Sequence, residues 1–250
     1  MSVRKRIQPH IMCGLGDVAE YVLLPGDPRR VERIASFFDE AKKVADYRGY
    51  ITYTGRVGGV GITACSSGIG CPSTAIVEEE LIKLGAKTLI RVGTTGAYQP
   101  DMEVGDLVIA TGAVRSDGTS RAYVPIEYPA VADFDVVSAL LTASRGCALK
   151  IHKGIIQSSD AFYAGGDMTW LTEGNVLSVE MESSTLFTLA SLRRVRAGTI
   201  LAVDGNLTRN IQKGEFDSGE KTGELDERVQ RAIDEEIKIA VGAVKLLASR

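Results

Sequence analysis

The chain has 250 residues, of which 44% are hydrophobic and 24% are charged, and its formal net charge is −3. This balance is typical of a single α/β domain with a sizeable core, and it argues against a nucleic-acid-binding surface as the main function. The sequence contains no apolar run of the ~18 residues that a membrane-spanning helix needs. Its basic first residues are not followed by an apolar stretch, so we expect no secretory signal.

The four cysteines form no Cys-x-x-Cys pair, and the two histidines, His10 and His152, complete no metal-ligand cluster with them. Closely spaced ligands usually mark a structural zinc site, and disulfides are rare in reducing compartments. We therefore expect a cytoplasmic protein with free thiols that binds neither a metal nor an organic cofactor.

Residues 14–19 match the loose dinucleotide-binding pattern Gly-x-Gly-x-x-Ala. That pattern holds a pyrophosphate only where a strand precedes it and a helix follows it. Here Gln8-Pro9-His10 precedes the pattern and the strand-like residues 21–24 follow it. We therefore do not interpret this segment as a dinucleotide site.

Residues 23–30 combine the end of a strand with the start of a helix. Gly26 allows a ligand to approach the backbone, Asp27 is a favoured N-cap residue, and Pro28 suits the first helical position. The N-terminus of a helix attracts anions, and Arg30 lies in the first turn, where the helix dipole disfavours a cation that no anion offsets. The segment is a candidate phosphate site; a capped surface helix with solvated arginines is the alternative.

Three strand-like segments follow, at residues 44–47, 51–57 and 60–65. Gly58-Gly59 favours a hairpin between the second and the third. Arg48 lies in the turn before the second segment, and its position alone would assign it to the surface.

A buried strand is predicted at residues 87–97, and it carries a charge. Thr88-Leu89-Ile90 leads into Arg91, which Val92-Gly93-Thr94-Thr95-Gly96-Ala97 follows. Burying a guanidinium is costly unless an anion or several hydrogen bonds satisfy it. The small residues after Arg91 offer the backbone N–H groups and hydroxyls that hold an oxyanion. Arg91 is therefore a second candidate anion ligand; a surface arginine that caps a turn is the alternative.

The rest of the chain alternates between predicted strands and helices. We expect strands at 106–114, 151–159, 175–180 and 197–204, helices at 72–84, 134–144, 183–192 and 229–247, a loop at 115–132 and a mobile loop at 205–222. This alternation predicts one α/β domain, residues 1–250, with helices on both sides of a sheet. Ligands of such folds gather beyond the C-terminal strand ends. At those ends lie Gly26, Arg30, Arg91, Glu180, Glu182 and Asp204.

Four segments carry a family resemblance through their order and spacing: residues 24–30 (Leu-Pro-Gly-Asp-Pro-Arg-Arg), 91–96 (Arg-Val-Gly-Thr-Thr-Gly), 158–163 (Ser-Ser-Asp-Ala-Phe-Tyr) and 179–182 (Val-Glu-Met-Glu). Together they resemble the hexameric nucleoside phosphorylases, which include bacterial-type purine nucleoside phosphorylases and uridine phosphorylases. The resemblance covers nearly the whole chain. Residues 192–205 and 214–217 look most like the purine nucleoside phosphorylases of apicomplexan parasites. The resemblance implies a three-layer α/β/α fold with a central mixed sheet.

Enzymes of this family use inorganic phosphate, as a co-substrate, to split a nucleoside into ribose 1-phosphate and a free base. By resemblance, phosphate would be bound by Gly26, Arg30, Arg91, Thr94 and, from a neighbouring subunit, Arg48. The nucleoside would be bound by Phe162, Val179, Glu180, Met181, Glu182 and the neighbour's counterpart of His10. Within that set Met181 and Glu182 would hold the ribose, while Phe162 and Val179 would line the base pocket. The implied assembly is a hexamer built as a trimer of dimers.

Asp204 would face the purine ring by the same resemblance. A purine leaves more easily when its N7 is protonated or receives a strong hydrogen bond. A free aspartic acid is almost fully ionised at neutral pH. The site would therefore have to favour the protonated form through burial, or share a proton with the base as negative charge grows on the ring. An aspartate that begins the turn Asp204-Gly205-Asn206 is the alternative.

Some residues depart from the family pattern. Uridine phosphorylases carry a Gln and an Arg shortly after the Phe162-Tyr163 pair, where this chain has Gly166 and Met168. Whether Arg209 assists Asp204, as an arginine does in the bacterial purine enzymes, stays open. We predict a purine nucleoside phosphorylase for 6-oxopurine nucleosides such as inosine and guanosine. A uridine phosphorylase, a hydrolytic nucleosidase and a non-catalytic nucleotide- or phosphate-binding protein are the alternatives.

Overall fold

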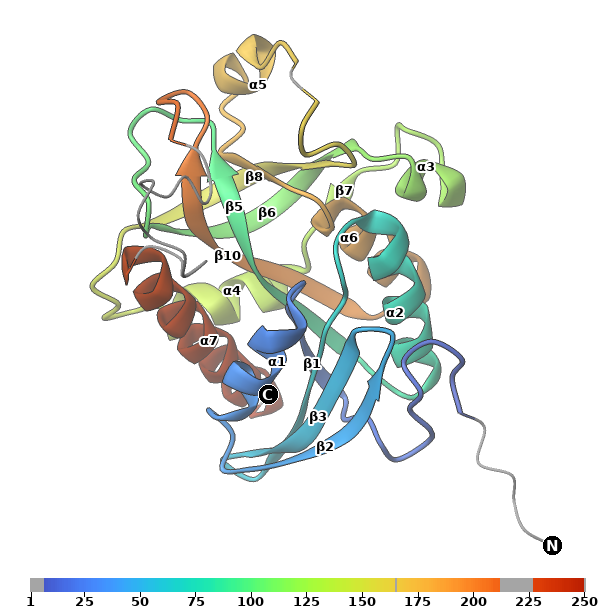
Figure 1. Ribbon diagram of the computed structural model, residues 1–250. Helices are drawn as coiled ribbons and strands as arrows, with labels where there is room; N and C mark the ends of the chain where they lie inside the picture. Colours follow the sequence, from blue (N-terminus) through green and yellow to red (C-terminus); the bar gives the residue numbers. More distant parts are fainter. Residues whose placement is uncertain (1–6, 165, 212–226, 250) are drawn as a thin grey trace, which may run out of the picture.

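A computed structural model of the protein describes residues 7–164, 166–211 and 227–249. Strands and helices alternate along the chain, as the sequence predicts (Figure 1). In chain order the elements are β1 (Tyr21–Leu24), α1 (Pro28–Ala35), β2 (Glu40–Tyr47), β3 (Tyr50–Val57), β4 (Val60–Cys65), α2 (Cys71–Lys83), β5 (Thr88–Ala97), β6 (Leu107–Ser116), α3 (Thr119–Tyr123), β7 (Ala130–Val131), α4 (Phe134–Ala143), β8 (Ile151–Ser159), α5 (Thr169–Glu173), β9 (Ser178–Glu180), α6 (Ser183–Arg193), β10 (Arg196–Asn206) and α7 (Glu227–Ala248).

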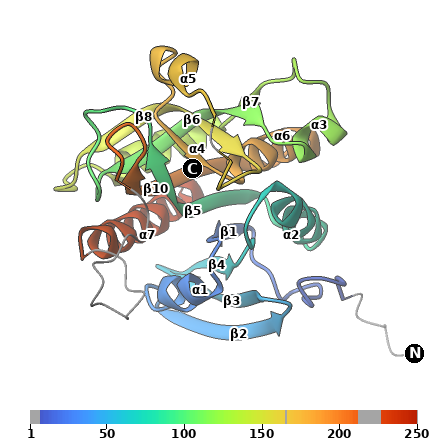
Figure 2. The same ribbon diagram turned by 45° about the horizontal axis from the view of Figure 1, so that its top comes forward.

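The strands form one mixed sheet in the order β10-β6-β8-β9-β5-β1-β4-β3-β2, and β7 pairs with β6. Strand β10 also pairs with β5 over most of its length. Strands β10, β6, β8, β9 and β5 therefore close into a ring, from which β1, β4, β3 and β2 extend as an open sheet (Figure 2). The predicted α/β fold with a mixed sheet is confirmed, whereas the alternation of elements did not predict the closure.

Helices cover the sheet from two sides. Helices α1, α4 and α7 pack on one face, where Val31, Val136 and Ile237 are buried in a common apolar cluster. Helices α2 and α6 pack on the other face, where Leu81 and Phe187 belong to a second cluster. Each fully buried aliphatic or aromatic side chain contributes roughly 1.5–3 kcal/mol, so these two clusters hold the layers together.

Local sequence explains the start of α1. The Asp27 carboxylate accepts a hydrogen bond from the Arg29 N–H at 2.9 Å, and Pro28 takes the first helical position. The carboxylate satisfies one of the unpaired N–H groups of the helix N-terminus, and the proline has no N–H group that would need a partner. Val31 and Ile34 then point into the core, and the helix ends at Ala35. The capped helix after the first strand is therefore confirmed.

Residues 14–19 form turns, in which the Gly14 N–H donates to the Asp17 carboxylate at 2.7 Å and Gly16 has a φ of +85°. They connect to β1 and open no helix, which supports the decision against a dinucleotide site. Within the described chain, no helix combines the length and the apolar character needed to cross a membrane.

The predicted loop 115–132 contains more structure than expected. Strand β6 continues to Ser116, and the segment includes α3 and β7. The buried Arg115 guanidinium organises it, because it donates to the backbone carbonyls of Val124, Pro125 and Tyr128. Hydrogen bonds from one side chain to the backbone of a following loop leave no periodic signal in the sequence.

Three other boundaries were wrong. Strand β2 begins at Glu40, four residues before the predicted start, and β9 is confined to Ser178–Glu180. The predicted loop 205–222 starts inside β10, because the Asn206 side chain donates to the backbone carbonyls of Gln99 and Met102 and extends the strand. Residues 212–222 of that predicted loop lie outside the described residues.

The close packing of α4 on β10 gives a test of the fold. A side chain added at Gly198 would meet Val136 Cγ1 at 2.3 Å and Leu140 Cδ1 at 3.5 Å. We expect Gly198→Ala to lower the free energy of unfolding by about 1–3 kcal/mol, because overpacking displaces core side chains. Gly61→Ala in β4 is the matched control, since its Cβ would meet only Ala19 Cβ at 3.6 Å. Urea unfolding of both variants measures the difference; equal stabilities would contradict this packing.

Candidate active site

The site lies where one edge of β5 changes partners. On that edge β1 pairs with residues 88–91 and β9 pairs with residues 96–97, while β10 occupies the opposite edge. In the described structure, neither β1 nor β9 pairs with residues 92–95. The chain leaves β1 at Pro25 just below this gap and enters α6 after Glu180 just above it. The gap therefore brings the predicted phosphate and nucleoside segments together, although they are far apart in sequence.

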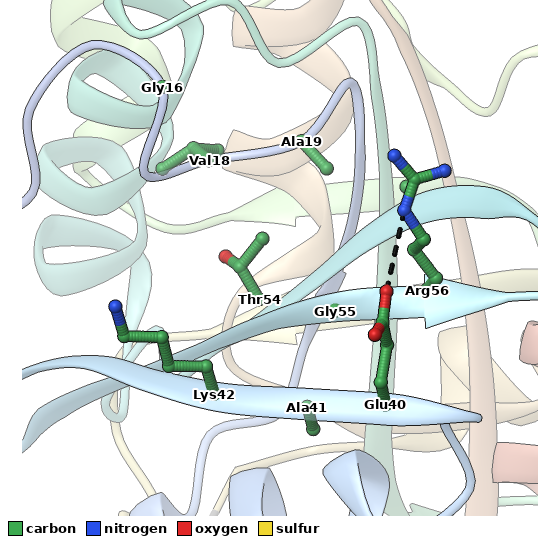
Figure 3. A pocket seen from close by; sticks show the side chains of 10 residues that line it. Gly16, Val18, Ala19, Glu40, Ala41, Lys42, Thr54, Gly55 and Arg56 are labelled. Carbon is green, nitrogen blue, oxygen red and sulfur yellow. Dashed lines mark ion pairs between the residues drawn. The ribbon is translucent and has the colours of Figure 1, made fainter.

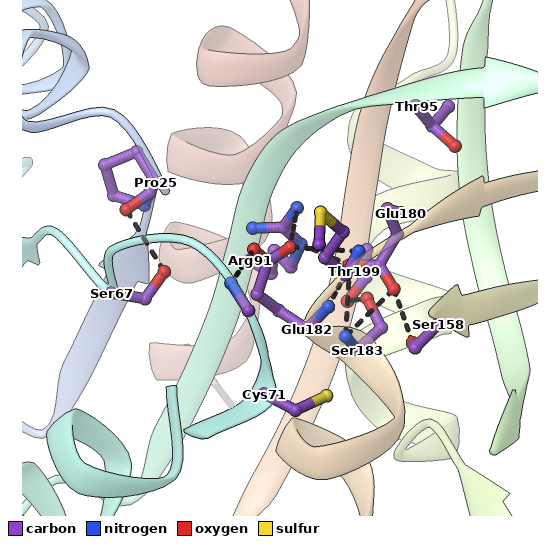
Figure 4. Close-up of polar contacts among 12 residues, drawn as sticks. Pro25, Ser67, Cys71, Arg91, Thr95, Ser158, Glu180, Glu182, Ser183 and Thr199 are labelled. Carbon is purple, nitrogen blue, oxygen red and sulfur yellow. Dashed lines mark hydrogen bonds and ion pairs between the residues drawn. The ribbon is translucent and has the colours of Figure 1, made fainter. Parts of the chain in front are cut away.

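Arg91 is the last residue of β5 that pairs with β1, at the edge of the gap, and it is buried. Its Nε donates to Glu180 Oε2 at 2.8 Å, and its Nη2 lies 2.5 Å from Glu182 Oε2 (Figure 4). The Arg91 side chain is only 7% exposed. Burial acts to lower the pKa of Arg91, but the carboxylates of Glu182 and Glu180 outweigh it, so that the pKa is raised. The guanidinium is therefore charged and held by two acids.

Arg30 reaches the same place from α1. Its Nη1 donates to the backbone carbonyl of Val92 at 3.3 Å, next to Arg91 in β5. Gly26 is also close, since a side chain there would lie 3.9 Å from Arg91 Nη1 and 3.2 Å from the Gly68 carbonyl. Thr94 follows on β5, where it pairs with Ala202 of β10. Four residues predicted to bind phosphate thus meet around the gap: Gly26, Arg30, Arg91 and Thr94.

Asp204 occupies a bulge in β10. Val203 pairs with Thr95 and Gly205 pairs with Gly96, so Asp204 is the extra residue between two paired positions. A bulge turns its side chain away from the regular alternation of a strand. Asp204 is 8% exposed. Its negative charge raises the pKa of the buried Glu236, whereas the positive charges of Arg30 and Arg91 lower it. The interpretation of Asp204 as the start of a turn is wrong, because the residue lies within β10.

Glu180 and Glu182 flank the start of α6 in different ways. Glu180 accepts hydrogen bonds from the Ser158 hydroxyl and from the backbone N–H groups of Glu182 and Ser183. Glu182 accepts one from the Gly70 N–H at 2.7 Å, and burial raises its pKa despite the nearby Arg91 charge. Glu180 thus caps α6, whereas Glu182 is the acid with fewer fixed donors and suits the predicted ribose contact.

Two predicted residues lie apart from the cluster. The His10 Nδ1 is 2.6 Å from Glu80 Oε1 on α2. Arg48 is exposed in the turn between β2 and β3, where its guanidinium covers the Tyr47 ring. Within the described part of this single chain, no contact joins either residue to Arg91. Their prediction as groups donated by a neighbouring subunit stays a prediction.

The residues predicted to line the base pocket, and Met181 of the predicted ribose site, differ in exposure. Val179 and Met181 are half-buried, and the Thr95 hydroxyl donates to the Val179 carbonyl. Phe162 is 61% exposed and packs edge-on against Tyr163, with ring centroids 4.9 Å apart. Arg209, whose assistance to Asp204 was left open, forms an ion pair with Glu103 at 2.5 Å.

Two hollows of the surface lie elsewhere. One of about 450 Å³ is formed by the 16–19 turn with β2 and β3, and the Glu40–Arg56 ion pair crosses its floor at 3.4 Å (Figure 3). The other, of about 660 Å³, lies over β6, β7 and β8. None of the predicted site residues lines either hollow. Within the predicted cluster, Arg91 is held by ion pairs with Glu180 and Glu182.

Two residues that sequence reasoning missed contribute to the cluster. Glu236 on α7 is fully buried, with Oε1 3.6 Å from Arg30 Nη1. Gly93 leaves room for Arg91, because a Cβ there would lie 2.9 Å from the Arg91 Cζ. A signal for Glu236 was present: it interrupts the apolar face that Ile233 and Ile237 define on the last helix.

Fold and geometry together define a class of protein: an α/β fold with the buried residues Arg91, Glu182 and Asp204 and the largely buried Arg30 near the C-terminal ends of its strands. The family model of the Phosphorylase superfamily matches residues 20–245. The chain belongs to this family, and it is a nucleoside phosphorylase, an enzyme of the pentosyltransferase type.

Several relatives span nearly the full chain. It is 44% identical to the guanosine phosphorylase of Halorubrum lacusprofundi, over 96% of this chain and 99% of the relative. It is 46% identical to the uridine phosphorylase of Thermococcus kodakarensis, over 97% of this chain and 87% of the relative. Among solved structures, the purine nucleoside phosphorylase of Toxoplasma gondii in complex with immucillin-H superposes with a TM-score of 0.86, at 31% identity and 97% coverage of both chains.

The close approach of the Arg91 side chain to Gly93 provides a test of the site. In Gly93→Ala the new methyl group would press on the Arg91 guanidinium at 2.9 Å and on Leu201 Cδ2 at 3.1 Å. Displacing a ligand-holding group by about 1 Å costs about 100-fold in rate, so we expect a loss of that order in kcat/KM for phosphate. Gly61→Ala is again the control, and steady-state kinetics with varied phosphate measures both. Unchanged kinetics in Gly93→Ala would contradict the placement of Arg91.

Proposed function

We propose that this protein is a purine nucleoside phosphorylase that cleaves 6-oxopurine nucleosides such as inosine and guanosine for purine salvage in the cytoplasm. It would use inorganic phosphate as co-substrate, without a metal or an organic cofactor. The observation that carries the proposal is that the buried Asp204 and the arginines Arg30 and Arg91 all act electrostatically on one buried side chain, Glu236. One cluster thus offers both an anion site and an acid for a leaving base.

The phosphate half of the reaction follows from the arginines. A phosphate dianion would take the place of the Glu182 carboxylate on Arg91 and of Glu236 on Arg30. Guanidinium groups hold phosphate through two parallel hydrogen bonds, which fixes its orientation. Positioning supplies most of the catalytic effect, because the phosphate oxygen then attacks C1′ as the bond to the base stretches.

The nucleoside half needs a ribose ligand and a proton donor. Glu182, released from Arg91, would accept hydrogen bonds from the two ribose hydroxyls. Asp204 would share a proton with N7 of the purine as the C1′–N9 bond breaks and negative charge grows on the ring. The guanosine phosphorylase of Halorubrum lacusprofundi and the Toxoplasma gondii structure support the purine assignment.

Uridine phosphorylase is the second candidate. Relatives with that name are 46% and 43% identical to this chain, in Thermococcus kodakarensis and Treponema pallidum. Against this reading, Gly166 and Met168 stand where the family resemblance places the side chains that read uracil. Neither Gly nor Met can form the paired hydrogen bonds of Gln and Arg.

A direct assay separates the candidates. The protein is incubated with inosine, guanosine or uridine, with and without inorganic phosphate, and free base and ribose 1-phosphate are quantified by chromatography. Phosphate-dependent release of hypoxanthine and guanine is the expected result. Phosphate-dependent release of uracil alone would identify a uridine phosphorylase, and phosphate-independent release a nucleosidase. Release of no base would leave a non-catalytic binding protein.

Asp204 gives a second prediction. We expect Asp204→Ala to lower kcat for inosine by about 10²–10⁴-fold, the usual effect of general acid catalysis, and to leave the KM for phosphate within a few-fold. Asp204→Asn should lose less, because its amide still donates a hydrogen bond to N7. An equal loss of turnover and phosphate affinity in both variants would show that Asp204 supports the fold or the arginines instead.

We further propose that the site is completed by a neighbouring subunit, which donates its counterparts of His10 and Arg48, and that three such dimers form a hexamer. Support comes from the exposure of Arg48 in its turn, beside Tyr47, which is 43% exposed, and from Ile69, which is 76% exposed at the start of α2. Large exposed apolar side chains near a charged group are typical of a protein interface.

Mixed subunits test this arrangement. Arg48→Ala and Asp204→Ala should each be strongly impaired alone, Arg48→Ala by about ten- to hundredfold through loss of a charged hydrogen bond. When both variants are co-expressed, about a quarter of wild-type activity should return, because random pairing makes half of the dimers hybrid and each hybrid holds one intact site. Activity no higher than the average of the two variants would contradict a shared site.

A further inference from the structure

Glu236 is an acid in an apolar setting. It lies on the core-facing side of α7, between Ile233 and Ile237, and its side chain is 0% exposed. Among the described residues, no donor forms a regular hydrogen bond with either of its carboxylate oxygens, although the Ala202 backbone amide is near enough to stabilise a negative charge there. A buried carboxylate costs several kcal/mol unless charges or hydrogen bonds compensate it. The location of Glu236 is therefore difficult to explain by packing alone.

The charged groups that face Glu236 come from three elements, and all belong to the candidate site. Arg30 of α1 lies 3.6 Å away, Arg91 of β5 adds a second positive charge, and Asp204 of β10 adds a negative one. Burial raises the pKa of Glu236 well above its usual value, and Asp204 adds to the rise. The two arginines and the Ala202 backbone amide oppose it.

We propose that Glu236 is the internal counter-ion of the phosphate site, and that it takes up a proton from solvent when a dianion binds to Arg30 and Arg91. This inference rests on the proposed function only in taking phosphate as the ligand of those arginines. In the free protein, at a pH above the raised pKa of Glu236, the carboxylate partly neutralises Arg30. In the complex the dianion takes over that role, and an ionised Glu236 would face it across a dry interior.

Glu236 is a better proton acceptor than the other glutamates of the site. Glu180 is stabilised as an anion by the Ser158 hydroxyl and by backbone N–H groups at the start of α6. Glu182 receives the Gly70 and Met181 N–H groups. Donors to a carboxylate favour its ionised form. Glu236 has only the weaker influence of the Ala202 backbone amide. When a dianion raises the local negative potential, the proton therefore goes to the acid with the fewest such donors.

Sulfate is a suitable probe, because it stays a dianion across the working pH range. Its binding is measured by isothermal titration calorimetry at one pH in two buffers of different ionisation enthalpy, which yields the number of protons taken up. We expect wild-type protein to take up close to one proton per sulfate, and its dissociation constant to rise by up to about tenfold per pH unit above the transition. Phosphate at a pH where it is already fully dianionic serves as a second ligand.

Two variants assign the proton. Glu236→Gln removes the titrating group at constant shape, so uptake should vanish and sulfate affinity should no longer depend on pH. Glu78→Gln is the matched control: Glu78 on α2 is also fully buried, burial raises its pKa well above the usual value, and it faces Glu79 and Arg193 instead of the site. Glu78→Gln should bind sulfate with wild-type proton uptake.

The outcomes separate this inference from the proposed function. Sulfate binding without proton uptake by the wild type, a measurement that needs no variant, would overturn the role of Glu236 and leave phosphorolysis untouched. Equal uptake by wild type and folded Glu236→Gln, checked by circular dichroism, would assign the proton elsewhere and also overturn it. Failure of both sulfate and phosphate to bind would overturn the inference together with the proposed phosphate site.

Discussion

The burial of one guanidinium is the constraint on which the site depends. Arg91 lies inside a strand that packs on both faces, where an uncompensated charge would be strongly destabilising. Glu180 and Glu182 compensate it, and their position requires β9 to join β5 beyond the end of β1. The loop before α2 is fixed by the same requirement, because the Gly70 N–H binds Glu182. The order of the strands, the position of the loop before α2 and the start of α6 thus all help to compensate the charge of Arg91.

The features predicted correctly from the sequence are those encoded locally. The Asp27 cap, the proline after it and the apolar spacing of α1 lie within one short segment, and the structure confirms the helix. Arg91 was conspicuous because a charge in an apolar run needs a partner. The sequence did not indicate which residue is that partner, because Glu180 lies on another strand and the order of the strands in the sheet brings it to Arg91.

The features that escaped prediction depend on contacts between distant segments. The ring closure needs β10 beside β5, and the bulge at Asp204 is visible only in the register between those strands. Glu236 escaped because it meets Arg30 across the space between α7 and α1. Composition and periodicity describe one element at a time. They therefore indicate that a residue is unusual without indicating which other residue explains it.

The bulge in β10 separates two tasks that share one small space. The arginines belong to α1 and β5, whereas Asp204 is the extra residue of the bulge between Val203 and Gly205, whose own pairings with β5 do not involve it. Exchange of that single side chain therefore leaves the backbone ladder intact. One side chain of this cluster can thus be replaced by point mutation while the helix and the strand that carry the two arginines keep their positions.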